Sequence, residues 1–563
     1  MFSRLILAIF LRFLPHTRRL ILSIASGLIL YLSWPPNTWS TFLIFISLVP
    51  LLIIEIDVAK KKISYFNYFT HSYLAFFIFN LLTTVWVRYA HVGGAAFAIL
   101  CNSFFMAVVL FFYARLKNNI KWKNKIFLLP VLWLSFEYLH LNWDLSWPWL
   151  TLGNVFASKI EWVQWYSYTG VLGGSLWVIL VNLAFLRIYK NRFSLHKIIV
   201  NFIFALCLIL FPLLSSLLFF HYTDDVVNSN SASIDVLIIQ PNINPHSEKY
   251  NESSSQEDQI KHTISLVDRY IDNSTNLLIF PETFIHKSIC VSDTGCRPAL
   301  AGYFYSPYNR YLNIQAKFEK LLKSHSSNLN IIVGASLLEQ SEQGPKSRLY
   351  GQKWYNIYNA ALHYNENKLD IYRKSKLVPG AEQMPFQNFL SPLLGNQALQ
   401  IGNSTMVGNF SIQDSVSTFS SDGYTVAPII CYESIYGDYV RQFVKKGAEA
   451  IVVITNDGWW KNTDGHKQHS MYAQLRAIET RRYVLRSANT GISSVINFKG
   501  VIEDKINWDV KDVIKRNVQL NNTHTFYVQH GDFLGRISAF LSVIVFLYCI
   551  VLCLSNKLIF SRK

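Results

Sequence analysis

The sequence predicts a membrane protein with two parts: a bundle of apolar helices and a mixed α/β domain outside the membrane. Apolar residues make up 51% of its 563 residues and charged residues 15%, against roughly 25% charged residues in soluble domains. The apolar residues are concentrated at the two ends of the chain, whereas the middle alternates short β-branched runs with polar runs. We therefore expect a transmembrane domain over 1–221, a soluble domain over 222–534, and a last helix with a short tail over 535–563.

Eight windows approach the roughly 20 apolar residues that a helix needs to cross a bilayer. They are 19–34, 39–57, 66–87, 93–114, 126–142, 163–186, 197–220 and 536–556, of which the first and the fifth are short. A cleaved signal peptide is the alternative interpretation of residues 1–34. Trp34, Pro35 and Pro36 stand where a cleavage site would need small residues, which favours a retained helix.

Positive charge in the loops predicts the orientation of these helices, because Lys and Arg are retained on the cytoplasmic side. Basic clusters precede the first window and follow the second, fourth, sixth and eighth, while the intervening loops carry almost none. Both termini are expected in the cytoplasm, with 222–534 on the outer side. The net charge of +17 lies largely in these loops, where it suits anionic lipid, so it does not indicate a nucleic-acid partner.

The outer segment has the composition of an α/β domain large enough to bury a core. The predicted strands are 233–240, 276–282, 330–336, 359–364, 426–433 and 448–457. Three stretches with apolar residues at three- and four-residue spacing predict helices, at 253–271, 308–325 and 466–485. On the last of these, His466 and His469 are expected as surface residues. Glu137, inside the fifth window, is expected to pair within the helix bundle.

The seven cysteines divide by location. Those inside predicted spans are expected to be small apolar side chains: Cys101, Cys207, Cys549 and Cys553. Cys290 and Cys296 bracket a loop on the oxidising side and are able to pair, although their spacing does not decide it. The sequence has no CxxC or HExxH motif and predicts no metal site. Cys431 remains as a candidate nucleophile.

A cysteine nucleophile needs a base for its proton, a cation near the thiolate, and donors for the oxyanion that it generates. Glu282 follows a predicted strand and a proline, which is where α/β sheets place functional groups. Lys374 lies in a turn segment, "YRKSKLVPGAEQMPF", in which Glu382 is able to orient it. Taken singly, the glutamate is typical of a capping carboxylate and the lysine of a solvated charge.

Three motifs in the order "FPET", "KSKLVP" and "CYE" together resemble the carbon-nitrogen hydrolase (nitrilase) superfamily. The resemblance implies an α-β-β-α sandwich with a catalytic triad of Glu282, Lys374 and Cys431. Lys374, and not Lys376, occupies the family's lysine position, three residues before Leu-Val-Pro. Seven apolar segments before this domain and one after it resemble the apolipoprotein N-acyltransferase family of bacterial inner membranes, as do "WPWLTLG", "TNDGWW" and "RSANTGIS".

The family resemblance also implies supporting and substrate-contacting residues. Glu382, Tyr432 and Glu433 are the expected supporting residues. Tyr250 is an expected substrate contact from the family pattern. Trp459, Trp460 and Trp149 are expected substrate contacts because aromatic side chains suit a lipid-facing site, and an interfacial belt or core packing is the alternative for these three. Two departures from the family pattern are visible: Tyr250 replaces a common Trp, and Pro379 is followed by Gly-Ala and not by Phe-Gly.

The chemistry implied by the resemblance is acyl transfer in two steps. A phospholipid ester acylates Cys431, and the resulting thioester is attacked by the α-amine of a diacylglyceryl-cysteine at a lipoprotein N-terminus. The ester and the thioester supply the energy, so no cofactor or metal is expected, and the chain is expected to act as a monomer. Extracting an acyl chain from the bilayer costs ~0.8 kcal/mol per CH₂, which favours a site at the interface between the bilayer and the outer aqueous side.

Two other classes of function remain open at this point. A membrane-tethered amidase or nitrilase would use the same triad with water as the acceptor. A transporter or scaffold with a degenerate domain would have lost at least one reacting position, whereas Glu282, Lys374 and Cys431 are all present.

Overall fold

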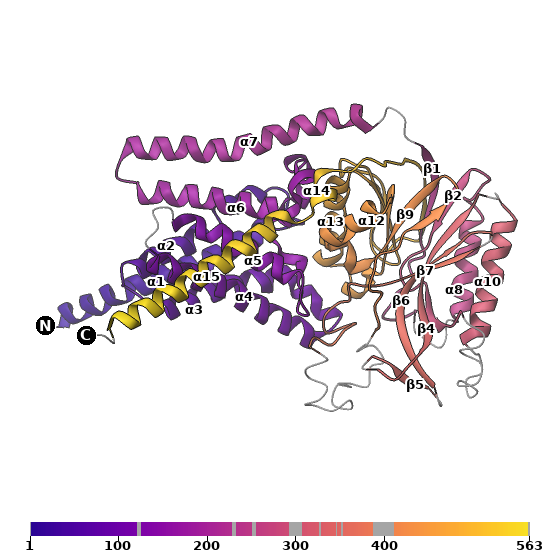
Figure 1. Cartoon of the computed structure of the whole chain (residues 1–563), viewed down its shortest axis with the longest axis horizontal. Helices are drawn as coiled ribbons and strands as arrows, with labels where there is room; N and C mark the ends of the chain where they lie inside the picture. The colour runs from indigo at the N-terminus through magenta and orange to yellow at the C-terminus, as the bar shows by residue number, and fades with distance from the viewer. Residues whose placement is uncertain are drawn as a thin grey trace. The chain divides into compact units, whose positions relative to one another are not determined.

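The computed structural model describes residues 2–120, 125–227, 232–249, 255–291, 307–325, 328–344, 346–350, 353–366, 368–386 and 410–560. The chain forms two compact units (Figure 1). The first, here called the helical unit, comprises Met1–Arg88, Val92–Phe220 and Asp532–Lys563. The second, here called the sheet unit, comprises Tyr89–His91 and His221–Gly531.

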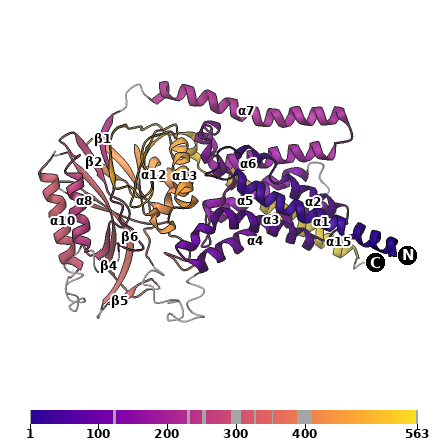
Figure 2. The ribbon, with the colours of Figure 1, turned by 180° about the vertical axis from the view of Figure 1, so that it is seen from behind.

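The helical unit is built from long apolar helices joined by short 3-10 turns (Figure 2). The helices are α1 (Phe2–Ser33), α2 (Val49–Ala59), α3 (Tyr65–Thr84), α4 (Val92–Asn119), α5 (Leu128–His140), α6 (Tyr166–Lys190), α7 (Leu195–Val227) and α15 (Phe533–Phe560). Within the described residues, six segments are long and apolar enough to cross a membrane: Thr41–Ala59, Tyr65–Tyr89, Val92–Asn119, Tyr166–Lys190, Leu195–Tyr222 and Phe533–Leu552.

Six such segments are fewer than the eight predicted spans, and the two that are missing are the first and the fifth. The fifth corresponds to α5, which has 13 residues, or a length of about 20 Å. That length is less than the ~30 Å of hydrocarbon, so α5 is not among the segments long enough to cross a membrane by this criterion, and the number of spans stays a prediction.

Some buried polar groups inside the helical unit are hydrogen-bonded within that unit. Glu137 accepts hydrogen bonds from Trp133 Nε1 at 2.9 Å and from the Leu152 backbone N–H at 2.8 Å. Asn102 donates to Asn80 at 2.7 Å, between α4 and α3. Since unpaired polar groups are costly away from water, these bonds help to fix which helix faces meet. The pairing expected for Glu137 within the bundle is therefore present.

The sheet unit contains two β-sheets. The first has the strand order β14-β1-β2-β4-β6-β5, with β3 paired to β4 and β7 paired to β6. The second has the order β13-β12-β11-β10-β9-β8. The strands of the first sheet are β1 (Ser233–Gln240), β2 (Thr275–Ile279), β3 (Ile285–Ile289), β4 (Asn330–Ser341), β5 (Arg348–Tyr350), β6 (Lys353–Tyr364), β7 (Leu369–Arg373) and β14 (Asp512–Gln519). Those of the second are β8 (Phe419–Ser421), β9 (Tyr424–Ile430), β10 (Ala450–Thr455), β11 (Tyr483–Ala488), β12 (Ser493–Ile496) and β13 (Ile502–Ile506).

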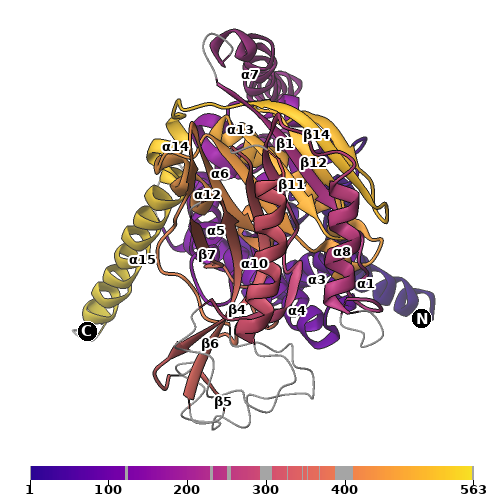
Figure 3. The same cartoon turned by 90° about the vertical axis from the view of Figure 1, so that its right-hand side faces the viewer.

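Helices cover the outer face of each sheet, which gives the α-β-β-α sandwich that the sequence predicts (Figure 3). α8 (Gln256–Val267) and α10 (Pro307–Lys323) pack on the first sheet, and α12 (Gly437–Lys445) and α13 (Asp464–Thr480) pack on the second. The central parallel strands β9, β10 and β11 are buried along nearly their whole length, which suits the largely apolar sequences of β9 and β10.

The predicted elements differ from the observed ones mainly at their ends. β1 has its predicted bounds, while the strand predicted at 426–433 ends at Ile430. The helix predicted at 466–485 ends at Thr480, because Arg481 adopts the left-handed conformation with a φ of 52°. Tyr483, Val484 and Leu485 belong instead to β11, which runs parallel to β10.

Gly334 of β4 allows the chain after β2 to approach the sheet closely. A Cβ at this position would lie 2.5 Å from the Pro281 carbonyl oxygen and 2.6 Å from the Glu282 Cα. We expect Gly334→Ala to lower the free energy of unfolding by about 1–3 kcal/mol, as overpacking does, measured by thermal unfolding in detergent. Gly344→Ala is the control, since the nearest atom to its Cβ would be 3.9 Å away; equal stability of the two variants would contradict the prediction.

Candidate active site

Each residue of the predicted triad follows the end of a β-strand. Glu282 comes three residues after β2, Lys374 directly after β7, and Cys431 directly after β9. The first two belong to one sheet and the third to the other. Strand pairing extends up to two of these positions, with the Lys374 N–H donating to the Asn359 carbonyl at 2.8 Å and the Phe280 N–H to the Ile332 carbonyl at 2.8 Å. The sheets therefore fix the backbone positions from which these side chains extend.

The three side chains converge in the interior of the sheet unit. Lys374 Nζ lies 3.2 Å from Glu282 Oε1 and 2.8 Å from Glu382 Oε1. Asn359 Nδ2 donates to Glu282 Oε1 at 2.7 Å. The Cys431 thiol interacts electrostatically with both Glu282 and Lys374. Exposed fractions of 5% for Glu282, 1% for Lys374 and 9% for Cys431 show that this is a buried cluster of charge around a thiol.

The charges of this cluster set its protonation. Burial lowers the pKa of Lys374, but the negative charges of Glu382 and Glu282 outweigh it and raise the pKa well above its ordinary value, so the lysine is a cation. Burial raises the pKa of the Cys431 thiol, Glu282 raises it further, and Lys374 opposes both. The thiol is therefore protonated at neutral pH and needs a base beside it to become a nucleophile.

Cys431 itself has an uncommon backbone conformation. Its φ is 51°, in the left-handed region, which costs a residue other than glycine about 1–3 kcal/mol and persists only where the surroundings enforce it. Ser434 Oγ donates to the Cys431 carbonyl at 2.7 Å, and the Ile430 N–H donates to Glu433 Oε2 at 2.9 Å. These bonds on both sides of Cys431 hold it in a tight turn after β9.

Glu433 connects the turn of the cysteine with the segment of the lysine. Its Oε1 accepts hydrogen bonds from the Ser375 N–H at 2.7 Å, the Lys376 N–H at 3.1 Å and the Tyr372 hydroxyl at 2.7 Å. Burial raises the pKa of Glu433 to about 7, while its donors favour the charged form. The structure thus gives the predicted supporting residue Glu433 a set of contacts that join the two sheets.

The other two predicted supporting residues lie in the same region. Glu382 Oε2 accepts from the Val378 N–H at 2.9 Å, which closes the turn after Lys374 while Oε1 pairs with the lysine. Tyr432 is 3% exposed, and its ring lies 5.4 Å from that of Tyr436.

The predicted substrate contacts lie in different places. Trp459 and Trp460 are partly exposed, with their rings 5.5 Å from those of His246 and His469, respectively. Trp149 belongs to the helical unit, where it is 1% exposed and packs against Trp86 at a ring distance of 4.8 Å. Tyr250 lies outside the described residues. A substrate role for each of these residues stays a prediction.

The expectation that His466 and His469 lie on a helix surface is wrong. They are 2% and 0% exposed, because α13 is buried on almost all sides. His469 Nδ1 lies 2.9 Å from Asp457 Oδ1, and Arg486 pairs with the other carboxylate oxygen of Asp457. Sequence reasoning missed Asp457 and Arg486, although both stand inside the family motifs "TNDGWW" and "RSANTGIS".

A third residue that sequence reasoning missed is Lys249, directly before Tyr250. Its Nζ donates to Thr283 Oγ1 at 2.8 Å and lies 3.4 Å from the Glu282 carbonyl oxygen. Thr283 has a φ of 46°, so Lys249 helps to hold a turn in which Glu282 is presented. Burial lowers the pKa of Lys249 to about 7, with Glu282 opposing that change.

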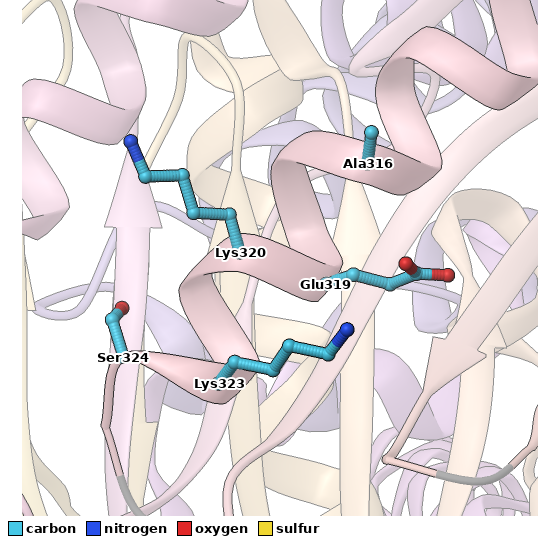
Figure 4. Close-up of a pocket in the computed structure, with 5 residues that line it drawn as sticks. All are labelled: Ala316, Glu319, Lys320, Lys323 and Ser324. Carbon is cyan, nitrogen blue, oxygen red and sulfur yellow. The ribbon is translucent and has the colours of Figure 1, made fainter.

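Other features of the described residues lie apart from this chemistry. A pocket on α10 is lined by Ala316, Glu319, Lys320, Lys323 and Ser324 and holds no residue of the triad (Figure 4). The part of the chain that the structure describes contains no group of three His, Cys, Asp or Glu residues able to hold a metal ion. Cys290 is disulfide-bonded, and Cys296 lies outside the described residues.

The charge of Glu282 should be visible in the reactivity of the thiol. Because the carboxylate raises the pKa of Cys431, Glu282→Gln should increase the thiolate fraction and speed alkylation by iodoacetamide about tenfold per pKa unit removed. The measurement is the pH dependence of Cys431 alkylation, read by peptide mass spectrometry. Glu319→Gln on α10 is the matched control, and a profile for Glu282→Gln that stays in place or moves to higher pH would refute this electrostatic account.

Comparisons with known proteins agree with this architecture. The sequence model of the carbon-nitrogen hydrolase family matches residues 237–526, and that of the apolipoprotein N-acyltransferase N-terminal domain matches residues 26–184. The carbon-nitrogen hydrolase from Helicobacter pylori is a similar solved structure, at 14% identity over 55% of this chain and 94% of that chain. Its TM-score is 0.34, which is too low to carry weight.

Curated relatives match almost the whole chain. The apolipoprotein N-acyltransferase of Chlorobaculum tepidum is 28% identical over 530 residues, covering 92% of this chain and 93% of its own. That of Thermotoga maritima is 25% identical over 546 residues, covering 93% and 92%, respectively. With both family models matched in one chain, the protein belongs to the carbon-nitrogen hydrolase superfamily and, within it, to the apolipoprotein N-acyltransferase family.

Proposed function

We propose that this protein transfers an acyl chain from a phospholipid to the α-amine of the N-terminal diacylglyceryl-cysteine of lipoproteins. The observation that carries the proposal is the buried cluster of Glu282, Lys374 and Cys431 in a chain that also carries the family's N-terminal helical domain. Lipoprotein N-acylation is the function of that family, and this chain spans nearly the full length of its relatives.

In the first half-reaction, Glu282 takes the thiol proton and the Cys431 sulfur attacks an ester carbonyl of the phospholipid. The tetrahedral oxyanion is stabilised by the Lys374 cation together with backbone N–H groups. The C–O bond then breaks, the lysophospholipid oxygen takes the proton from Glu282, and a thioester remains on Cys431. The 3.2 Å approach of Lys374 Nζ to Glu282 Oε1 supports this division of roles.

In the second half-reaction, the neutral α-amine of the acceptor attacks the thioester carbon. The amine gives up a proton to Glu282, the C–S bond breaks, and an amide forms. The Cys431 sulfur then takes the proton back, which restores the starting state. The bonds that break are the ester C–O bond and the thioester C–S bond, and each supplies the energy for its own step. The scheme therefore needs no cofactor and no nucleotide.

We infer that the protein is a monomer in the inner membrane, with both termini in the cytoplasm and the sheet unit in the periplasm. The apolar helices and the family support the membrane location. The basic loops after the second, fourth and sixth predicted spans support the orientation. A periplasmic sheet unit would also suit the disulfide at Cys290, since that compartment is oxidising.

The acyl-enzyme gives a direct test. After incubation with phospholipid, intact mass spectrometry should detect an acyl-sized adduct that hydroxylamine removes, because a thioester is labile to it. Cys431→Ala should abolish the adduct. Cys207→Ala, which removes an exposed free thiol of α7, is the matched control and should keep it. A folded native chain without an adduct would argue against the scheme, and an adduct that water alone turns over would favour the hydrolase alternative.

Glu382 is expected to affect the rate of acylation by positioning Lys374. Glu382→Gln removes the charge that lies 2.8 Å from Lys374 Nζ, so the ammonium is expected to shift towards Glu282 and to lose its alignment with the oxyanion. We expect the rate of acyl-enzyme formation at saturating phospholipid to fall roughly 10- to 100-fold.

Glu503→Gln serves as the control for this prediction. Glu503 accepts hydrogen bonds from Tyr483 and Asn497, both at 3.1 Å, on the strand β13. Its loss is expected to leave the acylation rate within about twofold of the native rate, as a surface substitution does. Similar rates for the two variants would mean that Glu382 does not position the lysine.

A further inference from the structure

Three chargeable side chains form a fully buried network behind Cys431 that the proposed reaction does not use. Arg486 of β11 pairs with Asp457 Oδ2, and His469 Nδ1 of α13 lies 2.9 Å from Asp457 Oδ1. The exposed fraction of each of the three is 0%. Burying charged groups is expensive unless they are paired. A network of this cost beside a reacting thiol indicates a role at the site.

The far side of the imidazole reaches the turn of Cys431. His469 Nε2 lies 3.0 Å from Ser434 Oγ and 3.3 Å from the Cys431 carbonyl oxygen, while Ser434 Oγ lies 2.7 Å from that carbonyl. The tautomer that satisfies Asp457 carries its proton on Nδ1, which leaves Nε2 as an acceptor. The single proton of the Ser434 hydroxyl then lies between two acceptors, His469 Nε2 and the Cys431 carbonyl. The serine hydroxyl is thereby fixed between the imidazole and the backbone of the nucleophile.

The same network controls a charge that acts on the thiol. The negative charge of Asp457 raises the pKa of Cys431, whereas a hydrogen bond from Thr455 lowers it. Burial alone would raise the pKa of Asp457, but Arg486 and His469 hold it well below its ordinary value, so the carboxylate is charged. Hydrogen bonds from His469 and Thr455 to Oδ1 draw this charge towards the donors. The remaining charges that act on the thiol are those of Glu282 and Lys374.

We propose that His469 is a positioning residue for the nucleophile: it fixes the turn of Cys431 through Ser434 and holds the charge of Asp457 away from the thiol. This proposal rests on the proposed function, in which Cys431 carries the acyl chain. It assigns His469 a role that acts through Ser434 and Asp457.

The same helix supplies a matched control. His466 lies three residues before His469 on α13 and is 2% exposed. Its Nε2 lies 3.1 Å from Asn462 Oδ1, and its ring lies 4.4 Å from that of Trp508. His466→Gln therefore removes a buried histidine from the same helix while leaving the contacts between His469 and the turn of Cys431 in place.

The experiment compares His469→Gln with His466→Gln in the full-length protein by three measurements: melting temperature, the rate of acyl-enzyme formation from phospholipid, and the pH dependence of Cys431 alkylation by iodoacetamide. His469→Gln should slow acylation at least tenfold and move the alkylation profile to higher pH by about one unit, since Asp457 loses a donor. His466→Gln should lower the melting temperature without either effect.

Equal acylation rates in the two variants, or an unmoved alkylation profile in His469→Gln, would overturn the proposal. Alkylation needs no acyl donor, so it reports on His469 even if the native protein forms no acyl-enzyme. A native protein that forms no acyl-enzyme would defeat the proposed function and not this proposal. If His469→Gln does not fold, Ser434→Ala replaces it. That variant should slow acylation at least tenfold while leaving the alkylation profile unmoved, because Asp457 keeps its donors; a native acylation rate would refute the positioning role.

Discussion

The buried ammonium of Lys374 is the constraint on which the rest of the site depends. A cation with 1% exposure needs compensation, and it has two carboxylates, Glu282 at 3.2 Å and Glu382 at 2.8 Å. Each carboxylate comes from a different loop, so the requirement to neutralise one charge gathers the chain after β2 and the turn after β7. Burial raises the pKa of the Cys431 thiol, and the excess of negative charge that this arrangement leaves beside the thiol raises it further.

The second constraint is the joint between the two sheets. Glu433 accepts backbone N–H groups from Ile430 on one side and from Ser375 and Lys376 on the other. Because a buried carboxylate with several donors tolerates little displacement, it sets the position of the nucleophile relative to the lysine. The left-handed backbone of Cys431 is one cost of this arrangement, and the hydrogen bonds around the turn offset it.

Local sequence predicted the residues whose role is tied to their own segment. Glu282 and Cys431 each follow a short apolar strand, Lys374 lies in a turn segment, and the motifs around all three identified them without any knowledge of tertiary contacts. The burial of His469 was not predicted, because a polar helix looks solvent-facing until its distant partner Asp457 is known. Arg486 of β11 was missed because the same partner is distant from it in sequence. The same limit merged β11 with α13: the left-handed conformation that ends the helix is at an arginine, where no glycine marks it.

A triad shared with hydrolases serves transfer only when the amine reaches the thioester before water does. The three reacting side chains are between 1% and 9% exposed, so the thioester would form where bulk water has little access. Donor and acceptor are both anchored in lipid, and a membrane concentrates them in two dimensions. In the proposed scheme the attacking amine is neutral, and the proton that it loses passes to Glu282, which the departing lysophospholipid would leave as a carboxylate. The same base would then serve both half-reactions of a transfer between two lipids.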